Sequence, residues 1–289
     1  MLFVKRHMNT SVGDTAKFIV FGGSGYVGQR IVKHLILSGQ NVVSISRSGE
    51  PSNFKAPSNG LGSITWHRAD IFEKEEWADQ LKDSSGVVSC IGAFGSNEFM
   101  EKVNGDANIL AIEESVKAGV PRFVFVSTGE NNLPDFVLKG YFNGKRRAEK
   151  ALKEAYANFN PTSNSIDDDD QKTLPVTGGF VLRPGFMYGA RQVPLKVPGP
   201  LASLPGLSPD GICLPLQLVG KPLSLVLGNP VAQGLRNSLP GMKAVLAKPL
   251  PVETVGRAAA DLVMGRVAKG DIPADGVVSI PDIEKIAGL

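Results

Sequence analysis

FIVFGGSGYVG, residues Phe18 to Gly28, joins a short apolar run to three glycines spaced three residues apart. Apolar residues then recur at helical spacing from Val27 to Ile36, and Gly39 ends that pattern. A strand, a glycine turn and a helix in this order predict a dinucleotide-binding loop, because glycine lets the backbone approach a pyrophosphate and the helix N-terminus supplies N–H donors. The alternative is a glycine-rich turn that binds nothing. The expected contacts are Gly22, Gly23, Ser24, Gly25, Tyr26, Val27 and Gly28.

Strand-like and helix-like stretches keep alternating after this loop. The expected strands are 41–46, 64–67, 86–90, 123–127 and 179–182, and the expected helices are 75–81, 107–118 and 141–156. Continuous apolar strands between helices predict an α/β fold with a doubly wound parallel sheet covered on both faces. We expect this domain to span residues 17–189.

The other segments differ in composition. Residues 1–16 are basic and free of acids up to Gly13, which is typical of an organelle leader or of a flexible arm. Residues 158–175 include four consecutive aspartates, which is typical of a surface loop. The alternative is a cation or partner site. Residues 190–251 are rich in Leu, Pro and Gly and predict a small lobe of short helices and turns. Residues 252–289 should return to the sheet through a helix at 252–267 and a strand at 276–280.

Composition excludes several function classes. The 31 Lys and Arg residues against 28 Asp and Glu leave a net charge of +3 with no dense basic face, so no nucleic-acid partner is expected. Two cysteines and three histidines offer no disulfide framework and no spacing typical of a metal site. No uninterrupted apolar run is long enough for a transmembrane helix, which leaves peripheral membrane association open.

The end of the second expected strand selects between the two nicotinamide dinucleotides. Ser46-Arg47-Ser48 stands where an acid would bind a ribose 2′-hydroxyl, and a guanidinium favours the 2′-phosphate of NADP over NAD. Glu50 lies close enough to weaken this inference. Asp70, followed by Ile71, ends the next strand and would contact the adenine amino group, or else cap a helix that begins near Glu73.

A candidate catalytic group comes from Tyr141 and Lys145, which lie four residues apart on an expected helix and so share a face. Ser127 and Thr128 end an expected strand at the carboxyl edge of the sheet, where ligand sites of such sheets form. We expect Lys145 to lower the Tyr141 pKa and to bind the nicotinamide ribose, with Tyr141 exchanging a proton with a carbonyl or alcohol that Ser127 or Thr128 holds. The alternative is a surface tyrosine packed over a lysine stem.

Together these motifs resemble the extended or atypical short-chain dehydrogenases/reductases, which are NAD(P)-binding Rossmann proteins. The likeness runs from Lys17 to Gly189 through FIVFGGSGYVG, SISRSG, VVSCIGAFGS, YFNGKRRAEKAL and FVLRPGFMYGARQ. It implies that the strand ending at Cys90, Ile91 and Gly92 passes beneath the cofactor and that Arg183, Pro184 and Gly185 lie beside the nicotinamide. A branch linked to mitochondrial ubiquinone biosynthesis in fungi, with plastid relatives, is most similar. The nucleotide-binding accessory subunit of respiratory complex I is more distantly similar.

Two functions follow from this resemblance. One is an NADPH-dependent reductase of a hydrophobic quinone or isoprenoid-type carbonyl, because the Leu/Pro-rich lobe offers few polar groups for a hydrophilic substrate. That lobe is equally consistent with a plain packed core. The other is a nucleotide-binding subunit without turnover, docked on complex I or a quinone-synthesis complex, in which NADPH stabilises the fold. The leader and the resemblance predict the matrix side of the mitochondrial inner membrane, with the plastid as second choice.

Overall fold

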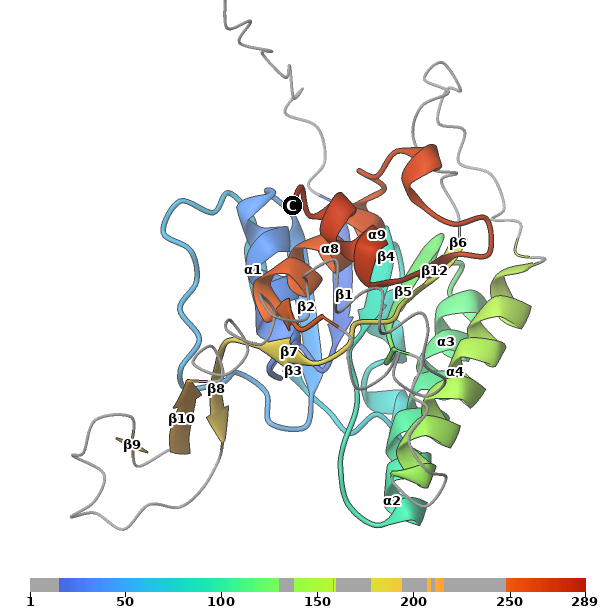
Figure 1. Cartoon of the computed structure of the whole chain (residues 1–289), viewed down its shortest axis with the longest axis horizontal. Helices are drawn as coiled ribbons and strands as arrows, with labels where there is room; N and C mark the ends of the chain where they lie inside the picture. Colours follow the sequence, from blue (N-terminus) through green and yellow to red (C-terminus); the bar gives the residue numbers. More distant parts are fainter. Residues whose placement is uncertain are drawn as a thin grey trace, which may run out of the picture.

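A computed structural model of the protein describes residues 16–129, 138–157, 159, 178–193, 207–208, 211–215 and 248–289. In this part of the chain the largest sheet is parallel and has the strand order β12-β6-β5-β4-β1-β2-β3 (Figure 1). The order reverses between β1 and β4, and ligands of doubly wound sheets bind at such a reversal. The strands are β1 (Lys17–Phe21), β2 (Asn41–Ser46), β3 (Ser63–Arg68), β4 (Gly86–Ser89), β5 (Arg122–Val126), β6 (Gly178–Leu182) and β12 (Val277–Val278).

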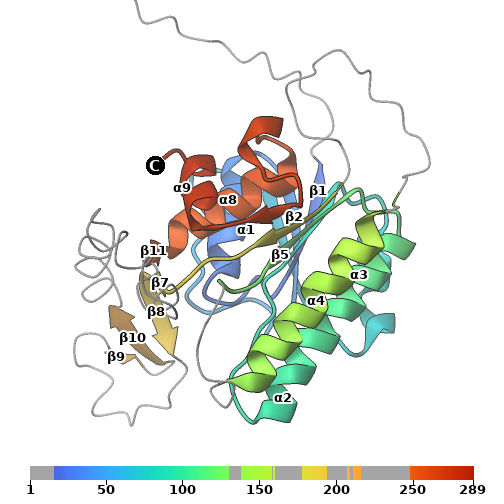
Figure 2. The same ribbon diagram turned by 45° about the vertical axis from the view of Figure 1, so that its right-hand side comes forward.

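Helices cover both faces of this sheet, as the doubly wound prediction requires. One face carries α1 (Gly28–Leu37), α8 (Val252–Met264) and α9 (Ile280–Ile286). The other carries α2 (Asn97–Glu101), α3 (Ala107–Lys117) and α4 (Lys139–Ala157), with a π-helical turn, η3 (Lys102–Asp106), between α2 and α3. Figure 2 shows the two layers on either side of the strands. The α/β fold class is therefore confirmed.

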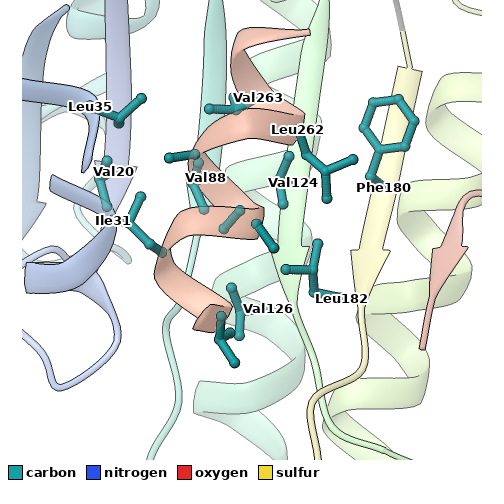
Figure 3. Packing of buried hydrophobic residues seen from close by; sticks show 14 of the residues in the cluster. Val20, Ile31, Leu35, Val88, Val124, Val126, Phe180, Leu182, Leu262 and Val263 are labelled. Carbon is teal, nitrogen blue, oxygen red and sulfur yellow. The ribbon is translucent and has the colours of Figure 1, made fainter. Parts of the chain in front are cut away.

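The sheet separates two apolar clusters because neighbouring residues of a strand point to opposite faces. In β1, Phe18 and Val20 pack toward α1 and α8, whereas Ile19 and Phe21 pack toward α3 and α4. Figure 3 shows part of the first cluster, in which side chains of α1 and α8 meet those of β1, β4, β5 and β6. The continuous apolar strands are thus buried on both faces, which fixes their carboxyl ends at one edge.

The prediction of a helix at 75–81 is wrong. The chain instead forms two short 3₁₀ turns, η1 (Lys74–Glu76) and η2 (Ala78–Leu81), on either side of Trp77. The Trp77 side chain is fully buried, and its indole N–H donates to the Ile71 carbonyl at 3.1 Å. A helix continued through this stretch would have to carry Trp77 away from that position, so burial of the ring overrides the helical pattern.

The C-terminal elements return to the sheet as expected, with different bounds. Helix α8 stops at Met264, before Gly265 at φ 69°, rather than at Val267. The strand expected at 276–280 is limited to β12, which pairs with β6. Helix α9 begins at once after it, because Ser279 and Asp282 form a capping box and Pro281 lies in the first turn.

The described part of the Leu/Pro-rich segment contains strands where short helices and turns were expected. Strands β8 (Ala190–Val193), β10 (Gly211–Pro215) and β9 (Leu207–Ser208) form an antiparallel sheet. Strands β7 (Met187–Tyr188) and β11 (Leu250–Pro251) pair in parallel. Residues 1–15 of the expected leader or flexible arm and the aspartate run at 167–170 lie outside the described residues. No helix in the described ranges is long and apolar enough to cross a membrane.

Candidate functional site

The glycine loop connects β1 to α1 with almost no free space. Gly22 has φ 77°, and a Cβ on Gly28 would lie 2.2 Å from the Gly22 carbonyl oxygen. A Cβ on Gly23 would lie 2.2 Å from the Ser44 hydroxyl oxygen on β2. Side chains at these positions would push the loop off the strands. The loop is therefore built for close approach of backbone to backbone, and it leaves N–H groups at the start of α1.

A cavity of about 500 Å³ opens beside this loop at the carboxyl edge of the sheet. Its wall contains most of the residues expected to bind the cofactor: Gly22, Ser24, Gly25, Ser46, Arg47, Ser48, Asp70, Ile71, Cys90, Ile91 and Gly92. They come from the ends of β1, β2, β3 and β4, which topology brings together at the reversal of strand order. The volume and the mixed lining suit part of a dinucleotide.

Several cavity residues were missed by sequence reasoning. These are Phe21, Ile45, Ala69, Phe72, Phe99, Lys102 and Val103. Phe72 directly follows the Asp70-Ile71 pair, so it could have been found by extending that motif by one residue. Phe99 and Lys102 come from α2 and η3, two elements that the sequence pattern did not predict.

The Arg47 side of the cavity carries the groups that would meet a ribose 2′-substituent. Arg47 and Ser48 are exposed, and the Ser48 and Ser24 hydroxyl oxygens lie 2.8 Å apart across the two loops. The Ser46 hydroxyl donates to the Gly49 carbonyl at 3.3 Å, which holds the turn. This corner is thus polar and cationic.

Asp70 does not cap a helix near Glu73. One of its carboxylate oxygens accepts from the Phe72 N–H at 3.0 Å, and η1 has no side-chain cap. This local hydrogen bond is typical of an aspartate that closes its own turn. It leaves Asp70 in the cavity wall, and the adenine contact stays a prediction.

The Tyr141 phenol lies outside the described lining of the cavity. Its ring stacks on Phe94, with centroids 5.1 Å apart and an angle of 12° between the planes. The Thr128 side chain is its hydrogen-bond partner. Burial raises the Tyr141 pKa, and the Thr128 bond offsets part of this rise. The expectation that Lys145 lowers this pKa is therefore wrong.

The Lys145 ammonium points to backbone carbonyls rather than to the phenol. It donates to Val126 at 2.9 Å and to Ile91 at 3.0 Å, at the ends of β5 and β4. The buried position lowers its pKa to about 8. Gly92, which lines the cavity, lies close to this ammonium, since a Cβ on Gly92 would be 3.6 Å from the Lys145 Nζ.

Two further polar groups border Lys145. The Ser127 hydroxyl oxygen is buried and has no hydrogen-bond partner among the described residues. Glu149, one turn after Lys145 on α4, pairs with Arg183 through contacts of 3.1 and 2.5 Å. The Gly129 N–H donates to the Pro184 carbonyl at 2.8 Å, which ties the chain after β6 to the chain after β5. The structure thus brings Ser127, Thr128 and Tyr141 together and places Lys145 behind them.

The remaining expected cofactor residues are placed around these two groups. Gly23, Val27 and Gly28 belong to the glycine loop but lie outside the cavity lining. Tyr26 points its hydroxyl toward Gly189, where a Cβ would lie 3.1 Å away. Arg183, Pro184 and Gly185 follow β6, on the side of Tyr141. In the described ranges no cluster of three or more His, Cys, Asp or Glu side chains could hold a metal ion.

Comparison with known proteins identifies the kind of nucleotide that such a site holds. A family model described as NAD(P)H-binding matches residues 22–160, which include the loop, the cavity wall and α4. The protein named "Uncharacterized protein At1g32220, chloroplastic" of Arabidopsis thaliana is 38% identical over 250 residues, which cover 86% of this chain and 71% of that protein. The chain belongs to the NAD(P)H-binding Rossmann family. The expected membership of an NAD(P)-binding Rossmann family is thereby confirmed.

Other proteins that resemble this NAD(P)H-binding chain have lower sequence identity to it. "MIOREX complex component 2" of Saccharomyces cerevisiae is 25% identical over 221 residues, covering 60% of this chain and 73% of that one. Among solved structures, Pal from Bacillus thuringiensis has a TM-score of 0.53 at 15% identity, with 94% of this chain and 82% of that chain covered. MoeE5 in complex with UDP-glucose and NAD has a TM-score of 0.50 at 21% identity, with 92% and 76% covered. These two structures show the fold alone.

Proposed function

We propose that this protein binds NADP(H) in the cavity and acts as a reductase of an apolar carbonyl compound of the quinone or isoprenoid type. The observation that carries the proposal is the pair of adjoining sites at one edge of the sheet. The cavity combines the glycine loop with Arg47, and the group of Ser127, Thr128 and Tyr141 lies next to it beyond Gly92 and Lys145. A preference for NADP over NAD is supported by the exposed Arg47 guanidinium in the cavity wall, which can pair with a 2′-phosphate.

The residues present fit a proton-donating role. When bound, a reduced nicotinamide supplies the hydride. The raised pKa keeps the Tyr141 phenol protonated at neutral pH, as a donor to a carbonyl oxygen must be. The Ser127 hydroxyl is a buried donor without a protein partner in the described ranges, and it can hold that oxygen. Tyr141 would thus donate the proton, and Ser127 is the residue proposed to orient the carbonyl.

The apolar nature of the substrate is supported by the residues around this edge. Phe94 is 63% exposed although it stacks on Tyr141, and Phe186, between β6 and β7, is 50% exposed. Large exposed aromatic side chains near a site are typical of binding to apolar partners. We propose the matrix side of the mitochondrial inner membrane as its location, with the plastid as alternative. The basic, acid-poor residues 1–13 and the chloroplastic relative support an organelle location.

Titration with NADP⁺ and NAD⁺ tests the nucleotide assignment. Arg47→Ala is expected to weaken NADP⁺ binding about tenfold or more and to leave NAD⁺ binding unchanged, because one phosphate contact is lost. Arg146→Ala, an exposed arginine on the outer side of α4, is the matched control and should change neither affinity. Equal binding of both nucleotides by the wild type, with no effect of Arg47→Ala, would overturn the NADP preference.

Oxidation of NADPH in the presence of short-chain quinones and aromatic ketones tests turnover. Tyr141→Phe is expected to lower kcat about a hundredfold or more while NADPH affinity stays unchanged, because the phenol lies outside the cavity. Turnover by Tyr141→Phe at the wild-type rate would remove Tyr141 as the proton donor.

A second function, a nucleotide-binding subunit without turnover on a membrane-bound complex, is favoured by one observation. Phe94 covers the Tyr141 ring and the Lys145 ammonium is engaged by two carbonyls, so neither group is open to a ligand in this arrangement. Purification from the native membrane distinguishes the two. NADPH that exchanges within minutes supports the reductase, and retained stoichiometric NADPH in a protein that co-purifies with a large complex supports the subunit.

A further inference from the structure

Helix α4, which runs along one layer beside α2 and α3 (Figure 2), carries cations on the side that it leaves exposed. Its buried side chains lie on the opposite side and include Phe142, Lys145 and Leu152. The exposed cations follow one another at intervals of seven, four and three residues, which keeps them on one helix face: Lys139, Arg146, Lys150 and Lys153. From the first to the last they extend about 21 Å at the α-helical rise. We refer to these four side chains as the basic row.

The acidic residues near the basic row leave most of its charge available. In the part of the chain that the structure describes, its first two cations have no carboxylate partner. Lys150 lies 3.8 Å from Glu154, and Lys153 lies 3.5 Å from Asp275. All four of these side chains are at least 45% exposed, and exposed ion pairs are weak in water. The row is therefore a local excess of positive charge on the surface.

Arg147, the remaining exposed cation of α4, lies on another side of the helix. Its guanidinium contacts the Glu101 carboxylate at 3.3 Å and the Asp106 carboxylate at 2.8 Å. These contacts connect α4 to the end of α2 and to η3. Arg147 thus has partners within the fold that account for its charge, and it does not belong to the row.

The composition of this helix face selects among possible partners. The other residues on it are Asn143 and Ala157, so the face has no exposed aromatic side chain. Surfaces that bind single-stranded RNA combine cations with aromatic rings that stack on bases. A second copy of the chain would place the row against itself, because a two-fold contact joins the same patch of both copies, and like charges repel. An anionic lipid surface requires only the cations, which its headgroup charge attracts.

The position of the row suits the proposed apolar substrate. Tyr141 follows Lys139 by two residues, so it lies in the first turn of α4 on the other side of the helix. A helix is about 10–12 Å across, so a bilayer in contact with the row would lie about one helix diameter from Tyr141. An apolar carbonyl compound dissolved in that bilayer would have a short path to the site.

We propose that the basic row docks the protein on an anionic membrane surface, with α4 lying along the bilayer. This inference rests on the proposed membrane location and deepens it, because it names the surface that makes the contact. Attraction between exposed cations and headgroup charge is reversible and weakens as the salt concentration rises.

Sedimentation of the full chain with lipid vesicles at low salt tests the docking surface. Vesicles of phosphatidylcholine mixed with an equal amount of phosphatidylglycerol are anionic, and vesicles of phosphatidylcholine alone are the neutral reference. We expect the wild type to bind only the anionic vesicles. The triple variant Arg146→Gln, Lys150→Gln, Lys153→Gln should bind them about a hundredfold more weakly, because each cation contributes about a fivefold factor. Its thermal unfolding should be unchanged, since the three side chains are exposed.

Two control variants separate the row from net charge and from side-chain shape. Lys55→Gln, Lys82→Gln, Lys285→Gln removes the same charge from exposed positions outside α4 and should bind as the wild type does. A variant that exchanges Lys for Arg and Arg for Lys at the three positions of the row keeps the charge and should also bind.

The other outcomes overturn the proposal in distinguishable ways. Equal losses in the two neutralised variants would show that net charge acts without the row. Wild-type binding to anionic vesicles that the α4 variant retains would remove the row and leave the membrane location. A wild type that binds no anionic vesicle, but binds single-stranded RNA or dimerises through these cations, would overturn both. Nucleotide titration is a separate readout, because the row lies outside the cavity lining.

Discussion

The carboxyl edge of the sheet has two halves, and they differ in how accessible their functional groups are to a ligand. Around β1, β2, β3 and β4 the strand ends surround an open cavity whose walls combine polar and apolar side chains. Around β5 and α4 the functional groups are engaged with each other and with the backbone: Tyr141 with Phe94 and Thr128, Lys145 with two carbonyls. Nucleotide binding is thus prepared by the fold, whereas chemistry at Tyr141 requires side chains to move.

The largest effect is expected from Gly28→Ala in the open half. The new Cβ would meet the Gly22 carbonyl oxygen at 2.2 Å and the Gly23 Cα at 2.6 Å, and neither backbone atom can give way cheaply. We expect roughly a hundredfold loss of NADP⁺ affinity, measured by calorimetry, together with a lower unfolding temperature. Gly270→Ala, where no atom lies within 4 Å of the added Cβ, should behave as the wild type. Unchanged affinity in Gly28→Ala would contradict the packed loop.

The next largest effect concerns the closed half. Glu149→Ala removes the carboxylate that holds Arg183 in a largely buried pair, and we expect a loss of about 2 kcal/mol or more in the free energy of unfolding. Glu101→Ala, whose partner Arg147 is at 3.3 Å in an exposed pair, should cost less than about 1 kcal/mol. Urea unfolding measures both. Similar losses in the two variants would show that the Glu149 pair does not stabilise the closed half.

A pH-dependent effect follows from the burial of Lys145. Its pKa of about 8 in the folded chain lies below the ordinary value of 10.5. Below pH 8 both states hold the proton, and the cost of burying the charge is constant. Between about pH 8 and 10.5 the folded chain releases it first, so the wild type gains stability relative to Lys145→Met as pH rises. The gain is at most about 1.4 kcal/mol per pH unit. A difference that stays flat from pH 7 to 10 would contradict the lowered pKa.

The smallest effect is expected from Ser24→Ala at the entrance of the cavity. It removes the 2.8 Å contact between the Ser24 and Ser48 hydroxyls, which is partly exposed to water. We expect NADP⁺ affinity to fall by no more than roughly two- to threefold, because a single neutral hydrogen bond contributes little in water. A tenfold loss would show that this pair binds the nucleotide directly.

Most of the parallel sheet could be predicted from sequence, because apolar runs and glycine turns are local signals. The strand expected at 41–46 coincides with β2, and the helix expected at 107–118 differs from α3 by one residue. The prediction of a helix at 75–81 was wrong because Trp77 is buried against core residues that are distant from it in sequence. The α9 start could have been found from Ser279 and Asp282, which form a capping signal in the sequence itself.

The site was predictable to the extent that it follows strand ends. Eleven expected cofactor residues line the cavity, since their positions follow from β1, β2, β3 and β4. Lys102 was missed because it lies in a π-turn that no local sequence pattern predicts. Gly105 of this turn packs on Gly144 of α4, a contact between segments that are distant in sequence. The prediction that Lys145 lowers the Tyr141 pKa was wrong for a similar reason. Spacing on a helix placed Lys145 nearby, but the carbonyls of Ile91 and Val126 compete for its ammonium.

The cover of one sheet face by α8 has a consequence for synthesis. Val20, Val88 and Val124 are in place early in the chain, but the helix that shields them begins only at Val252. A growing chain emerges from the ribosome slowly compared with hydrophobic collapse, so this apolar face waits uncovered while the intervening residues are made. Such a nascent chain is expected to engage chaperones until α8 docks beside α1 on the strands.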